Sequence, residues 1–371
     1  MMTCNLRPIA LGVLCASVSL PWAASTALAA GTIKIDDTKW ISVGAGLRTS
    51  FNMVEDAAPS GNDYSKDFQL DNIRLYVNGQ IHENIKFEFN TERQDNGTGD
   101  DDIRVLDALA KFEFSDLVNI WAGRFLPPSD RSNLDGPFYL NTWNFPLAQA
   151  YPSIFAGRDD GAAFWGQVNG GQLKYQLGAF QGTSGLPNTD DNLLYAGRLT
   201  YNFWDPEPGY YNASTYYGAK DILAFGLVYQ TQEDSATNSL NGNTEDFTGW
   251  SIDGLMEKKL GNSGVISVEG TYYDYEGDPV LAGLDATGYF LLGAYLFPQK
   301  IGIGQFQPVV RYQNLDIDNG AETDNWELGV NYIIDGHNAK LSLLYSNTDV
   351  DPAVGSSNDF NALQLGLQLQ I

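Results

Sequence analysis

Histidine and cysteine, the residues on which catalysis and metal binding most often depend, are nearly absent from this sequence. The chain of 371 residues has two histidines, His82 and His337, and both of its cysteines, Cys4 and Cys15, precede residue 30. A serine nucleophile needs a neighbouring base, usually histidine, and we interpret both histidines as solvated turn residues. We therefore expect no catalytic residue and no cofactor, which argues against an enzyme such as a lipase or protease.

A recognisable metal-binding loop is also missing, although acidic residues are plentiful. Asp316, Asp318 and Glu327 have the spacing of positions one, three and twelve of an EF-hand, but the sixth position, which must be glycine, is Ala321. The stretch 95–102 has two glycines but no glutamate at position twelve. We expect no dedicated metal site and interpret these stretches as solvated loops. Divalent ions that bridge such loops to lipopolysaccharide are the alternative.

Positive charge is scarce. The chain has 21 Lys and Arg against 46 Asp and Glu, which gives a formal net charge of −25. Nucleic-acid binding depends on a surplus of Lys and Arg that neutralises phosphates, so nucleic acid is excluded as an expected partner. In contrast, 39 Gly, 20 Tyr, 19 Phe and 8 Trp are present. Glycine-rich, aromatic-rich chains favour strands joined by tight turns.

The only long apolar stretch lies at the start of the chain. Arg7 precedes the stretch 8–24, and Ala27-Leu28-Ala29 follows as a small-residue site. This layout predicts a secretory signal peptide over residues 1–29, removed on export through the Sec pathway; a retained membrane anchor is the alternative. The mature domain, residues 30–371, would then contain no cysteine, and it has no apolar run long enough for a membrane-spanning helix.

Instead, the mature chain alternates apolar and polar residues with a period of two. Near its start, the odd-numbered positions 41–53 are mostly apolar, and the even-numbered positions between them are small or polar. Near its end, Leu363, Leu365, Leu367, Leu369 and Ile371 alternate with Gln and Gly. Strands of about ten residues with one apolar face are typical of transmembrane β-barrels. We predict an all-β, antiparallel barrel of sixteen strands, with fourteen or eighteen as alternatives, closed by pairing of the first strand with the last.

The connections alternate in length, as they do in outer-membrane barrels. Short turns are expected at 82–84, 169–171, 261–264 and 335–338, and long external loops at 55–66, 93–102, 232–247, 274–285 and 347–359. A soluble β-sandwich also alternates, but its strands are commonly only about five or six residues long. Tyr and Trp recur near the ends of the apolar rows, as membrane interfaces favour: Trp40, Tyr201, Trp204, Tyr229, Trp250, Tyr295, Trp326 and Tyr345.

One connection breaks this pattern. From Leu126 to Arg158 the chain contains five prolines and no alternation. Long loops without secondary structure are usually functional in compact proteins, so we predict that residues 126–158 fold into the lumen as a constriction loop after the fifth strand. An external cap is the alternative. The charged residues that we expect to contribute to the constriction, or else to form ion pairs that stabilise the loop, are Asp130, Arg131, Asp135, Arg158, Asp159 and Asp160.

Several short stretches of the sequence occur in an order and spacing that match a known protein family: residues 74–79 (RLYVNG), 86–89 (KFEF), 106–108 (LDA), 121–128 (WAGRFLPP), 157–161 (GRDDG), 204–211 (WDPEPGYY) and 327–332 (ELGVNY). On these stretches the sequence resembles the phosphate-selective porin O and P family of Gram-negative bacteria. The resemblance implies a sixteen-stranded barrel in the bacterial outer membrane, a homotrimer and an inward-folded third external loop. Two features depart from the family: the chain is strongly acidic, whereas phosphate-selective members have a surplus of Arg and Lys in the pore, and it ends in Ile371 rather than Phe.

A porin lumen is filled with water, so the polar face of each strand is expected to line it. The phase of the alternation places charges of both signs inside. The predicted pore-lining cations are Arg48, Arg74, Lys86, Lys111, Arg124, Lys174, Arg198, Arg311 and Lys340, and the predicted carboxylates are Glu88, Asp107, Glu113, Asp253, Glu257, Glu269 and Glu327.

These patterns predict an outer-membrane channel for passive diffusion of small polar solutes and ions, in contact with membrane lipid and lipopolysaccharide. Neither sign of charge dominates the wall, and acidic loops would concentrate cations at the mouth. We therefore expect a general or weakly cation-preferring channel, with an anion-selective or phosphate-selective porin as the alternative. An adhesion barrel with a closed lumen would need bulky apolar residues or a plug inside, whereas the expected inward rows hold Gly, Ser, Gln and charge.

Overall fold

The computed structural model describes residues 31–95 and 101–371. The predicted signal peptide, residues 1–29, lies outside the described residues. Within them the chain is almost entirely β-structure, and α1 (Arg131–Asp135) is the only helix. Among these residues no helix is long and apolar enough to cross a membrane.

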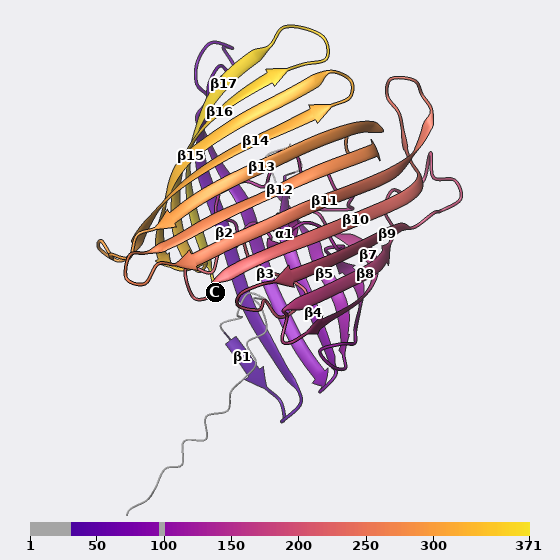
Figure 1. The fold of residues 1–371 in the computed structure, drawn as a ribbon, viewed down its shortest axis with the longest axis vertical. Helices are drawn as coiled ribbons and strands as arrows, with labels where there is room; N and C mark the ends of the chain where they lie inside the picture. Colours follow the sequence, from indigo (N-terminus) through magenta and orange to yellow (C-terminus); the bar gives the residue numbers. More distant parts are fainter. Residues whose placement is uncertain (1–30, 96–100) are drawn as a thin grey trace, which may run out of the picture.

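Sixteen antiparallel strands form a closed barrel (Figure 1). Each strand pairs with the next along the chain, and β17 pairs with β2, with Gln370 opposite Gly46 and Ala362 opposite Val54. The predicted strand number and closure are therefore confirmed. The strands are β2 (Trp40–Val54), β3 (Asp67–His82), β4 (Ile85–Asp95), β5 (Asp101–Glu113), β6 (Asn119–Phe125), β7 (Asp159–Val168), β8 (Leu173–Phe180), β9 (Leu194–Asn202), β10 (Ile222–Thr237), β11 (Thr244–Lys259), β12 (Val265–Asp278), β13 (Leu284–Leu296), β14 (Gln305–Ile317), β15 (Ala321–Asp335), β16 (Ala339–Asp351) and β17 (Asn358–Gln370).

A seventeenth strand, β1 (Gly31–Lys34), was not predicted. It pairs with the first residues of β2, from Lys34 opposite Trp40 to Gly31 opposite Val43. Ile371, the last residue of the chain, exchanges backbone hydrogen bonds with Ala45. β17 and Ile371 thus pair with β2 as far as Ala45, and β1 pairs with the part of β2 that precedes Ala45.

The barrel is apolar outside and polar inside, the reverse of a water-soluble protein. On β10, Leu227 and Tyr229 are exposed, whereas Gln230 and Gln232 are each only 1% exposed. On β14, Val310 is 38% exposed and its neighbour Arg311 is 2% exposed. Large apolar side chains that face outward all around a closed sheet require a lipid environment, because water would make such a surface unstable.

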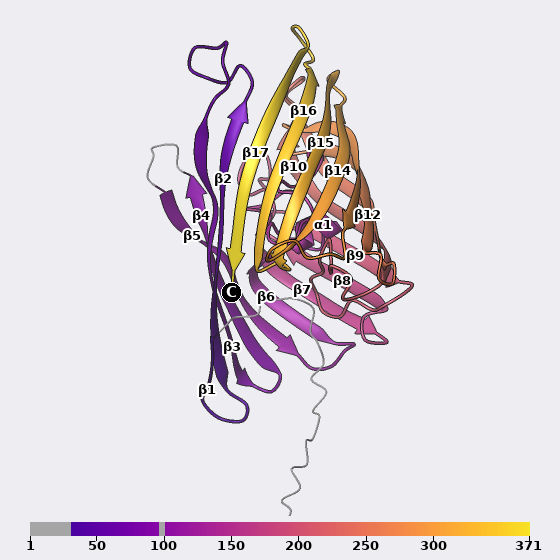
Figure 2. The same cartoon turned by 90° about the vertical axis from the view of Figure 1, so that its left-hand side faces the viewer.

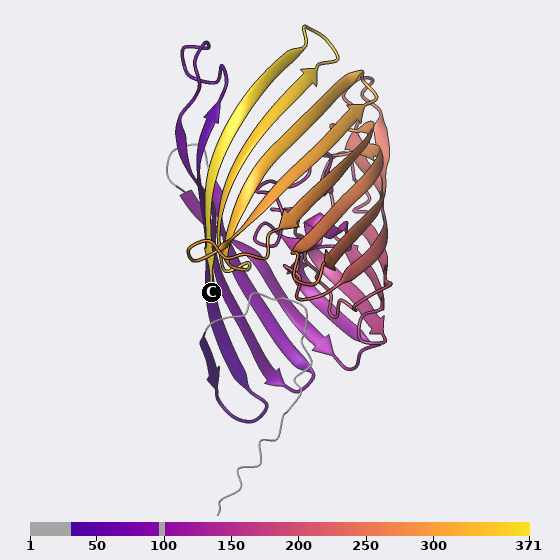
Figure 3. The same cartoon turned by 60° about the vertical axis from the view of Figure 1, so that its left-hand side comes forward.

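The connections differ in length at the two ends, as Figures 2 and 3 show. At the long-loop end, the β2–β3 and β16–β17 connections project beyond the barrel. Two predicted long loops are wrong, however: β10 extends to Thr237 and β11 begins at Thr244, while β12 extends to Asp278 and β13 begins at Leu284. The alternation continues through polar residues there, so composition alone misplaced the strand ends.

One connection at the short-turn end is long. Between β9 and β10 the chain runs from Phe203 to Asp221 without regular structure. Figures 1 and 2 show α1 enclosed by the strands. Residues 126–158 enter the lumen from the long-loop end, and residues 206–220, which we name the lumenal strap, enter from the short-turn end.

Candidate functional site

The constriction loop, residues 126–158, is held inside the barrel by side chains of the wall. Its prolines and irregular backbone leave carbonyl groups without a sheet partner, and buried carbonyls need donors. Donors from strands all around the barrel meet them. Arg48 Nη2 donates to the Trp143 carbonyl (2.5 Å), Lys340 Nζ to that of Leu140 (3.0 Å), Arg311 Nη1 to that of Asn144 (3.0 Å), Gln230 Nε2 to that of Pro128 (2.8 Å) and Gln368 Nε2 to that of Phe138 (2.9 Å).

Within this loop, α1 is capped by Asp130, whose carboxylate accepts from Ser132 N (3.1 Å). Tyr273 on β12 donates to the same carboxylate (2.9 Å). Arg131 is fully buried and makes a two-pronged ion pair with Glu207 of the lumenal strap, at 2.8 and 2.6 Å. Asp135, at the other end of α1, accepts from Asn212 Nδ2 (2.6 Å) and Ser214 Oγ (2.5 Å) of the strap.

Burial changes the acidity of these loop and strap groups. Burial raises the pKa of Asp135 well above its usual range, and the nearby Arg131 offsets this only in part. Burial and the charge of Asp253 raise the pKa of Asp130 to about 6. Burial would also raise the pKa of Glu207, but the Arg131 guanidinium outweighs it and lowers that pKa to about 2. Arg131 and Glu207 therefore form a charged pair, whereas burial disfavours the ionised form of Asp135.

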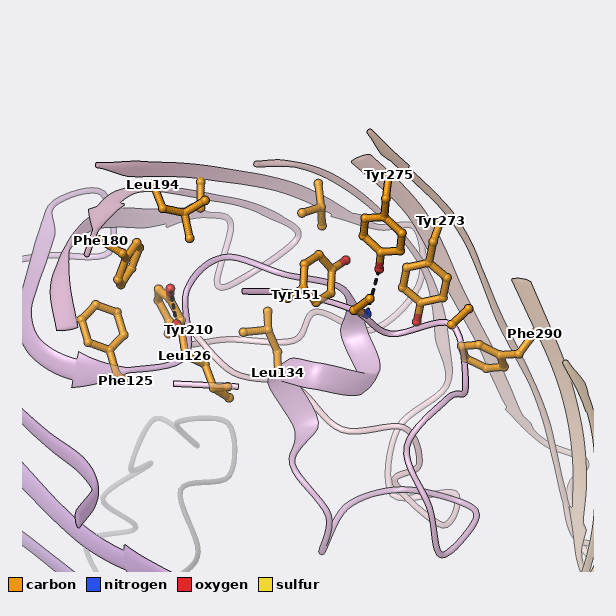
Figure 4. Close-up of a cluster of buried hydrophobic side chains, with 14 of the residues drawn as sticks. Phe125, Leu126, Leu134, Tyr151, Phe180, Leu194, Tyr210, Tyr273, Tyr275 and Phe290 are labelled. Atoms are coloured by element: carbon orange, nitrogen blue, oxygen red, sulfur yellow. Dashed lines mark hydrogen bonds between the residues drawn. The ribbon is translucent and has the colours of Figure 1, made fainter. Parts of the chain in front are cut away.

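Aromatic side chains of the barrel wall, the strap and the constriction loop form a buried cluster inside the barrel (Figure 4). Tyr210 of the strap stacks on Trp121 of β6, with ring centroids 4.7 Å apart, and its hydroxyl donates to the Leu126 carbonyl (3.0 Å). Phe125 packs on Phe180 beside Tyr210, whereas Tyr273 lies at the other end of the cluster, next to Tyr151 and Tyr275. The sequence interpretation, which put mainly Gly, Ser, Gln and charge inside, did not anticipate this apolar sector.

The adjoining part of the wall, on β3, β4 and β5, is polar and charged, and Lys111 of β5 lies over the Trp121 ring. Four ion pairs form a row along it: Lys86–Glu113 (2.6 Å), Lys111–Glu88, Arg158–Asp107 (3.1 Å) and Arg74–Glu92 (2.6 Å). Asn90 joins two of the pairs, because its amide donates to both Glu88 (2.7 Å) and Asp107 (2.9 Å). Three of these pairs come from predicted pore-lining or loop residues, while Glu92 was missed because it lies beside a stretch interpreted as loop.

A cavity of about 60 Å³ lies between this charged wall and the loop. Its lining combines residues of β3–β5 with residues of both inserted segments: Arg74, Tyr76, Asn78, Glu88, Asn90, Asp107, Leu126, Leu134, Asp135, Gly136, Tyr139, Arg158 and Tyr211. Guanidinium, carboxylate, amide and phenol groups therefore meet in one space. Such a lining can bind either sign of charge and exchange hydrogen bonds with neutral polar solutes.

The remaining predicted wall residues face inward at other sectors. Arg198 pairs with Asp253, Arg311 with Glu327 (2.7 Å), and Glu257 and Glu269 accept hydrogen bonds from the strap. Lys174 Nζ donates to the Tyr211 carbonyl (3.4 Å). The structure therefore does not gather the predicted residues into one ring. It distributes them between the charged wall and anchors for the two inserted segments.

Arg124 and Asp160 do not face the lumen, contrary to the sequence interpretation. Trp121 and Phe125 of β6 point inward, and side chains alternate between the two faces along a strand. Arg124, the residue before Phe125, therefore points outward, where it forms an ion pair with Asp160 of β7 (2.7 Å). Asp159, the neighbour of Asp160, is buried and accepts from Gly182 N (2.7 Å). The phase was misassigned because aromatic residues were expected outside and charge inside, and the aromatic inner sector reverses this rule.

His337 is also not the solvated turn residue that was expected. It lies in the β15–β16 turn, between the rings of Tyr139 and Tyr217, and its Nε2 donates to the Thr215 carbonyl of the strap (3.0 Å). Burial lowers the pKa of His337 to about 4. His82 does lie at an exposed position at the end of β3.

Comparison with known proteins identifies the family. A profile of the phosphate-selective porin O and P family matches residues 41–233 and 273–371. The chain belongs to this family. No curated protein matches the sequence.

Solved structures of outer-membrane proteins share this porin's fold at low sequence identity. The anion-selective porin from Comamonas acidovorans aligns with 90% of this chain and 100% of its own, with a TM-score of 0.59 and 13% identity. OmpF of Salmonella typhi, solved in complex with daunomycin, covers 92% of this chain and 100% of its own, with a TM-score of 0.63 and 12% identity. OprB of Pseudomonas putida covers 90% and 94%, with a TM-score of 0.61 and 9% identity. The chain thus has the channel fold of outer-membrane porins.

Proposed function

We propose that this protein is a narrow outer-membrane channel for passive diffusion of small polar solutes and ions, and that solutes pass along the charged wall of β3–β5. The observation that supports this proposal is the cavity between that wall and the constriction loop, inside a barrel whose outer surface is apolar. The inserted segments occupy much of the remaining lumen. Catalysis is not part of the proposal, because the four cation–carboxylate pairs along the β3–β5 wall bind one another and His337 is held by backbone and aromatic contacts.

We propose weak ion discrimination with a preference for cations. Along the charged wall, Arg74, Lys86, Lys111 and Arg158 each have a carboxylate partner, which cancels most of their field. The unbalanced carboxylates lie largely in exposed connections and strand ends at the long-loop end, such as Asp56, Asp63, Asp190, Asp351 and Asp359. A ring of acidic loops raises the local concentration of cations at the entrance.

Anion selectivity is the second candidate, and specific observations favour it. Among residues 31–95 and 101–371, the lumenal cations Arg48, Lys174 and Lys340 form no ion pair and donate to carbonyl groups instead. The family is named for phosphate selectivity, and one structural neighbour is an anion-selective porin. If these three cations reach the diffusing ion, they would attract anions.

Reversal potentials in planar bilayers distinguish the two candidates. The purified protein is inserted into a bilayer with a tenfold gradient of KCl, and the sign of the zero-current potential reports the preferred ion. A potential of the sign for K⁺ supports the first candidate, and a strong Cl⁻ preference supports the second. Absence of any conductance from correctly folded protein contradicts the channel proposal itself.

Assembly and export complete the proposal. We propose that residues 1–29 direct Sec export and are removed, and that the mature chain forms a homotrimer in contact with lipid and lipopolysaccharide. One structural neighbour, OmpT of Vibrio cholerae, has been described in a trimer form. Mass determination of the protein purified from outer membranes tests both the cleavage after residue 29 and the oligomeric state.

A further inference from the structure

The β9–β10 connection crosses the lumen rather than simply joining two strands. At one side, Gln176 Nε2 of β8 donates to the Tyr210 carbonyl (2.6 Å), and Gly209 N donates to Gln167 Oε1 of β7 (2.8 Å). At the other side, the Glu257 carboxylate of β11 accepts from Thr215 Oγ1 (2.7 Å) and Gly218 N (2.8 Å). His337, in the β15–β16 turn, binds the Thr215 carbonyl. The lumenal strap, residues 206–220, therefore connects β7–β8 to β11 and the β15–β16 turn.

The strap is also joined to the constriction loop. Arg131 and Glu207 are each 0% exposed, and Arg131 makes a third bond to the Ala213 carbonyl of the strap (2.9 Å). Asn212 donates to Asp135, and Ser214 Oγ lies within hydrogen-bond distance of both Asp135 (2.5 Å) and Glu269 of β12 (2.8 Å). Because Arg131 lies on the loop from one end of the barrel and Glu207 on the strap from the other, one buried ion pair couples the two insertions.

We propose that the lumenal strap is a second constriction element, inserted from the short-turn end, and that the Arg131–Glu207 pair holds it in place. Together with the constriction loop it fills the sector from β7 to β15 and confines solutes to the β3–β5 wall, where Tyr211 of the strap lines the cavity. This inference rests on the proposed channel function. It adds that the size of the channel is limited from both ends, and that Glu207 is a positioning residue for the narrow part.

The backbone allows a clean deletion. The β9–β10 ladder continues beyond the strand ends, because Phe203 N donates to the Leu223 carbonyl (2.7 Å) and Asp205 N to the Asp221 carbonyl (2.9 Å). Asp205 and Asp221 thus face each other across a hairpin, and an Asn-Gly turn is suited to join two such residues. Replacing residues 206–220 by Asn-Gly removes the strap and leaves the barrel ladder unchanged. The constriction loop retains its own anchors on Arg48, Arg311 and Lys340.

Single-channel conductance of this deletion variant tests the proposal. Conductance follows the open cross-section of the narrowest region, so we expect it to rise by about twofold or more relative to the wild type. An unchanged conductance in a folded, membrane-inserted variant would overturn the proposal. If the wild type conducts and the deletion does not change the conductance, the proposal about the strap is wrong but the channel function stands. If the wild type itself does not conduct, the channel function is wrong.

A point variant keeps the test informative if the deletion does not fold. Glu207→Gln retains the shape of the side chain but leaves Arg131 buried without its counter-charge, and breaking a buried ion pair in this way strongly destabilises the contact. We expect the strap to detach from the constriction loop and the barrel wall for part of the time, so that conductance fluctuates between two levels. Lys220→Gln is the matched control, because Lys220 contacts only the strap itself, through the Pro206 carbonyl (2.8 Å) and the Tyr216 ring at the base of the segment.

Thiol labelling gives a readout that does not depend on ion flow. The predicted mature chain has no cysteine, and Ser214 on the strap is 1% exposed. In the Ser214→Cys protein we expect slow reaction with a water-soluble maleimide, and in Ser214→Cys/Glu207→Gln a reaction at least about tenfold faster, because local opening governs access. Rapid labelling of the single variant, or equal rates in the two proteins, would contradict a seated strap.

Discussion

At the scale of single residues, the ion pairs on the β3–β5 wall decide which charge a diffusing ion meets. Arg158 and Asp107 line the cavity together and neutralise each other. Removing one partner exposes the other charge to the solute. Arg124 and Asp160 form a similar pair, but on the outer face of the barrel, so they provide an internal control.

Charge-neutralising substitutions should therefore change selectivity in opposite directions. We expect Arg158→Gln to shift the reversal potential toward cations and Asp107→Asn to shift it toward anions, each by a severalfold change in permeability ratio. Bilayer recordings under a KCl gradient measure this. Arg124→Gln should leave the ratio unchanged, and an equal shift in that variant would show that solutes do not pass along the β3–β5 wall.

His337 predicts a pH dependence of stability. Its folded pKa is about 4, below the usual value of 6.5, so the unfolded chain takes up a proton at a higher pH than the folded barrel does. Stability is therefore fully present above pH 6.5 and falls as the pH drops from 6.5 to 4. The neighbouring positive charge is Lys340, which acts in the same direction.

His337→Gln keeps a donor for the Thr215 carbonyl but does not titrate. We expect the variant to lose less stability than the wild type between pH 7 and pH 5, by about 1 kcal/mol after allowance for partial exposure. The temperature at which the folded form disappears in gel-mobility assays measures the difference. Parallel pH profiles for the two proteins would contradict the buried, neutral histidine.

The residues also show what sequence reasoning can and cannot predict at this scale. Alternation placed Arg198, Asp253 and Glu327 inside correctly, because the large apolar residues next to them in the sequence, Leu199, Ile252 and Trp326, face outward. The same reasoning failed at Arg124, since Trp121 and Phe125 pack inward on Tyr210. Glu207 was missed because its partner Arg131 is 76 residues away in the sequence, and no local pattern links the two.

At the scale of elements, the outward apolar rows determine whether a strand can remain in the membrane. Leu291 lies in the middle of β13 and is 59% exposed on the outer face. An arginine placed near the bilayer midplane of such a barrel costs about 2–4 kcal/mol. We expect Leu291→Arg to destabilise the barrel by this amount in folding titrations from urea into lipid vesicles.

Leu240→Arg serves as the control for this prediction. Leu240 is 68% exposed but lies in the β10–β11 connection at the long-loop end, where water solvates a charge. Its replacement should change stability by less than about 0.5 kcal/mol. A similar loss in both variants would show that β13 does not face lipid.

The sequence predicted the strands well where apolar and polar residues alternate regularly, and it predicted the segments that fill the lumen poorly. Strand number and barrel closure follow from matching apolar rows at 41–53 and 363–371. The five prolines marked residues 126–158 as irregular. The lumenal strap left a weaker signal: two prolines at 206 and 208 and a 19-residue connection (Phe203–Asp221) at the end where other turns are short. Its path across the lumen depends on tertiary contacts that periodicity does not encode.

At the scale of the whole molecule, the acidic surface at the long-loop end acts at a distance and is sensitive to salt. The Debye length is about 30 Å at 0.01 M and about 3 Å at 1 M ionic strength. If exposed loop carboxylates produce the proposed cation preference, the preference should be clear in dilute KCl and nearly absent in 1 M KCl. Recordings at constant gradient and varied total salt test this. A preference that persists in 1 M KCl would instead locate its origin in the narrow lumen.

The seam of the barrel has a practical consequence for labelling the protein. Ile371 is hydrogen-bonded to Ala45, and the next positions along β2, from Val43 to Trp40, are already paired with β1. A purification tag fused after Ile371 would compete with β1 for the same backbone groups. An epitope inserted near Gly61, in the exposed β2–β3 connection, avoids that competition and is better suited to following the protein on intact cells.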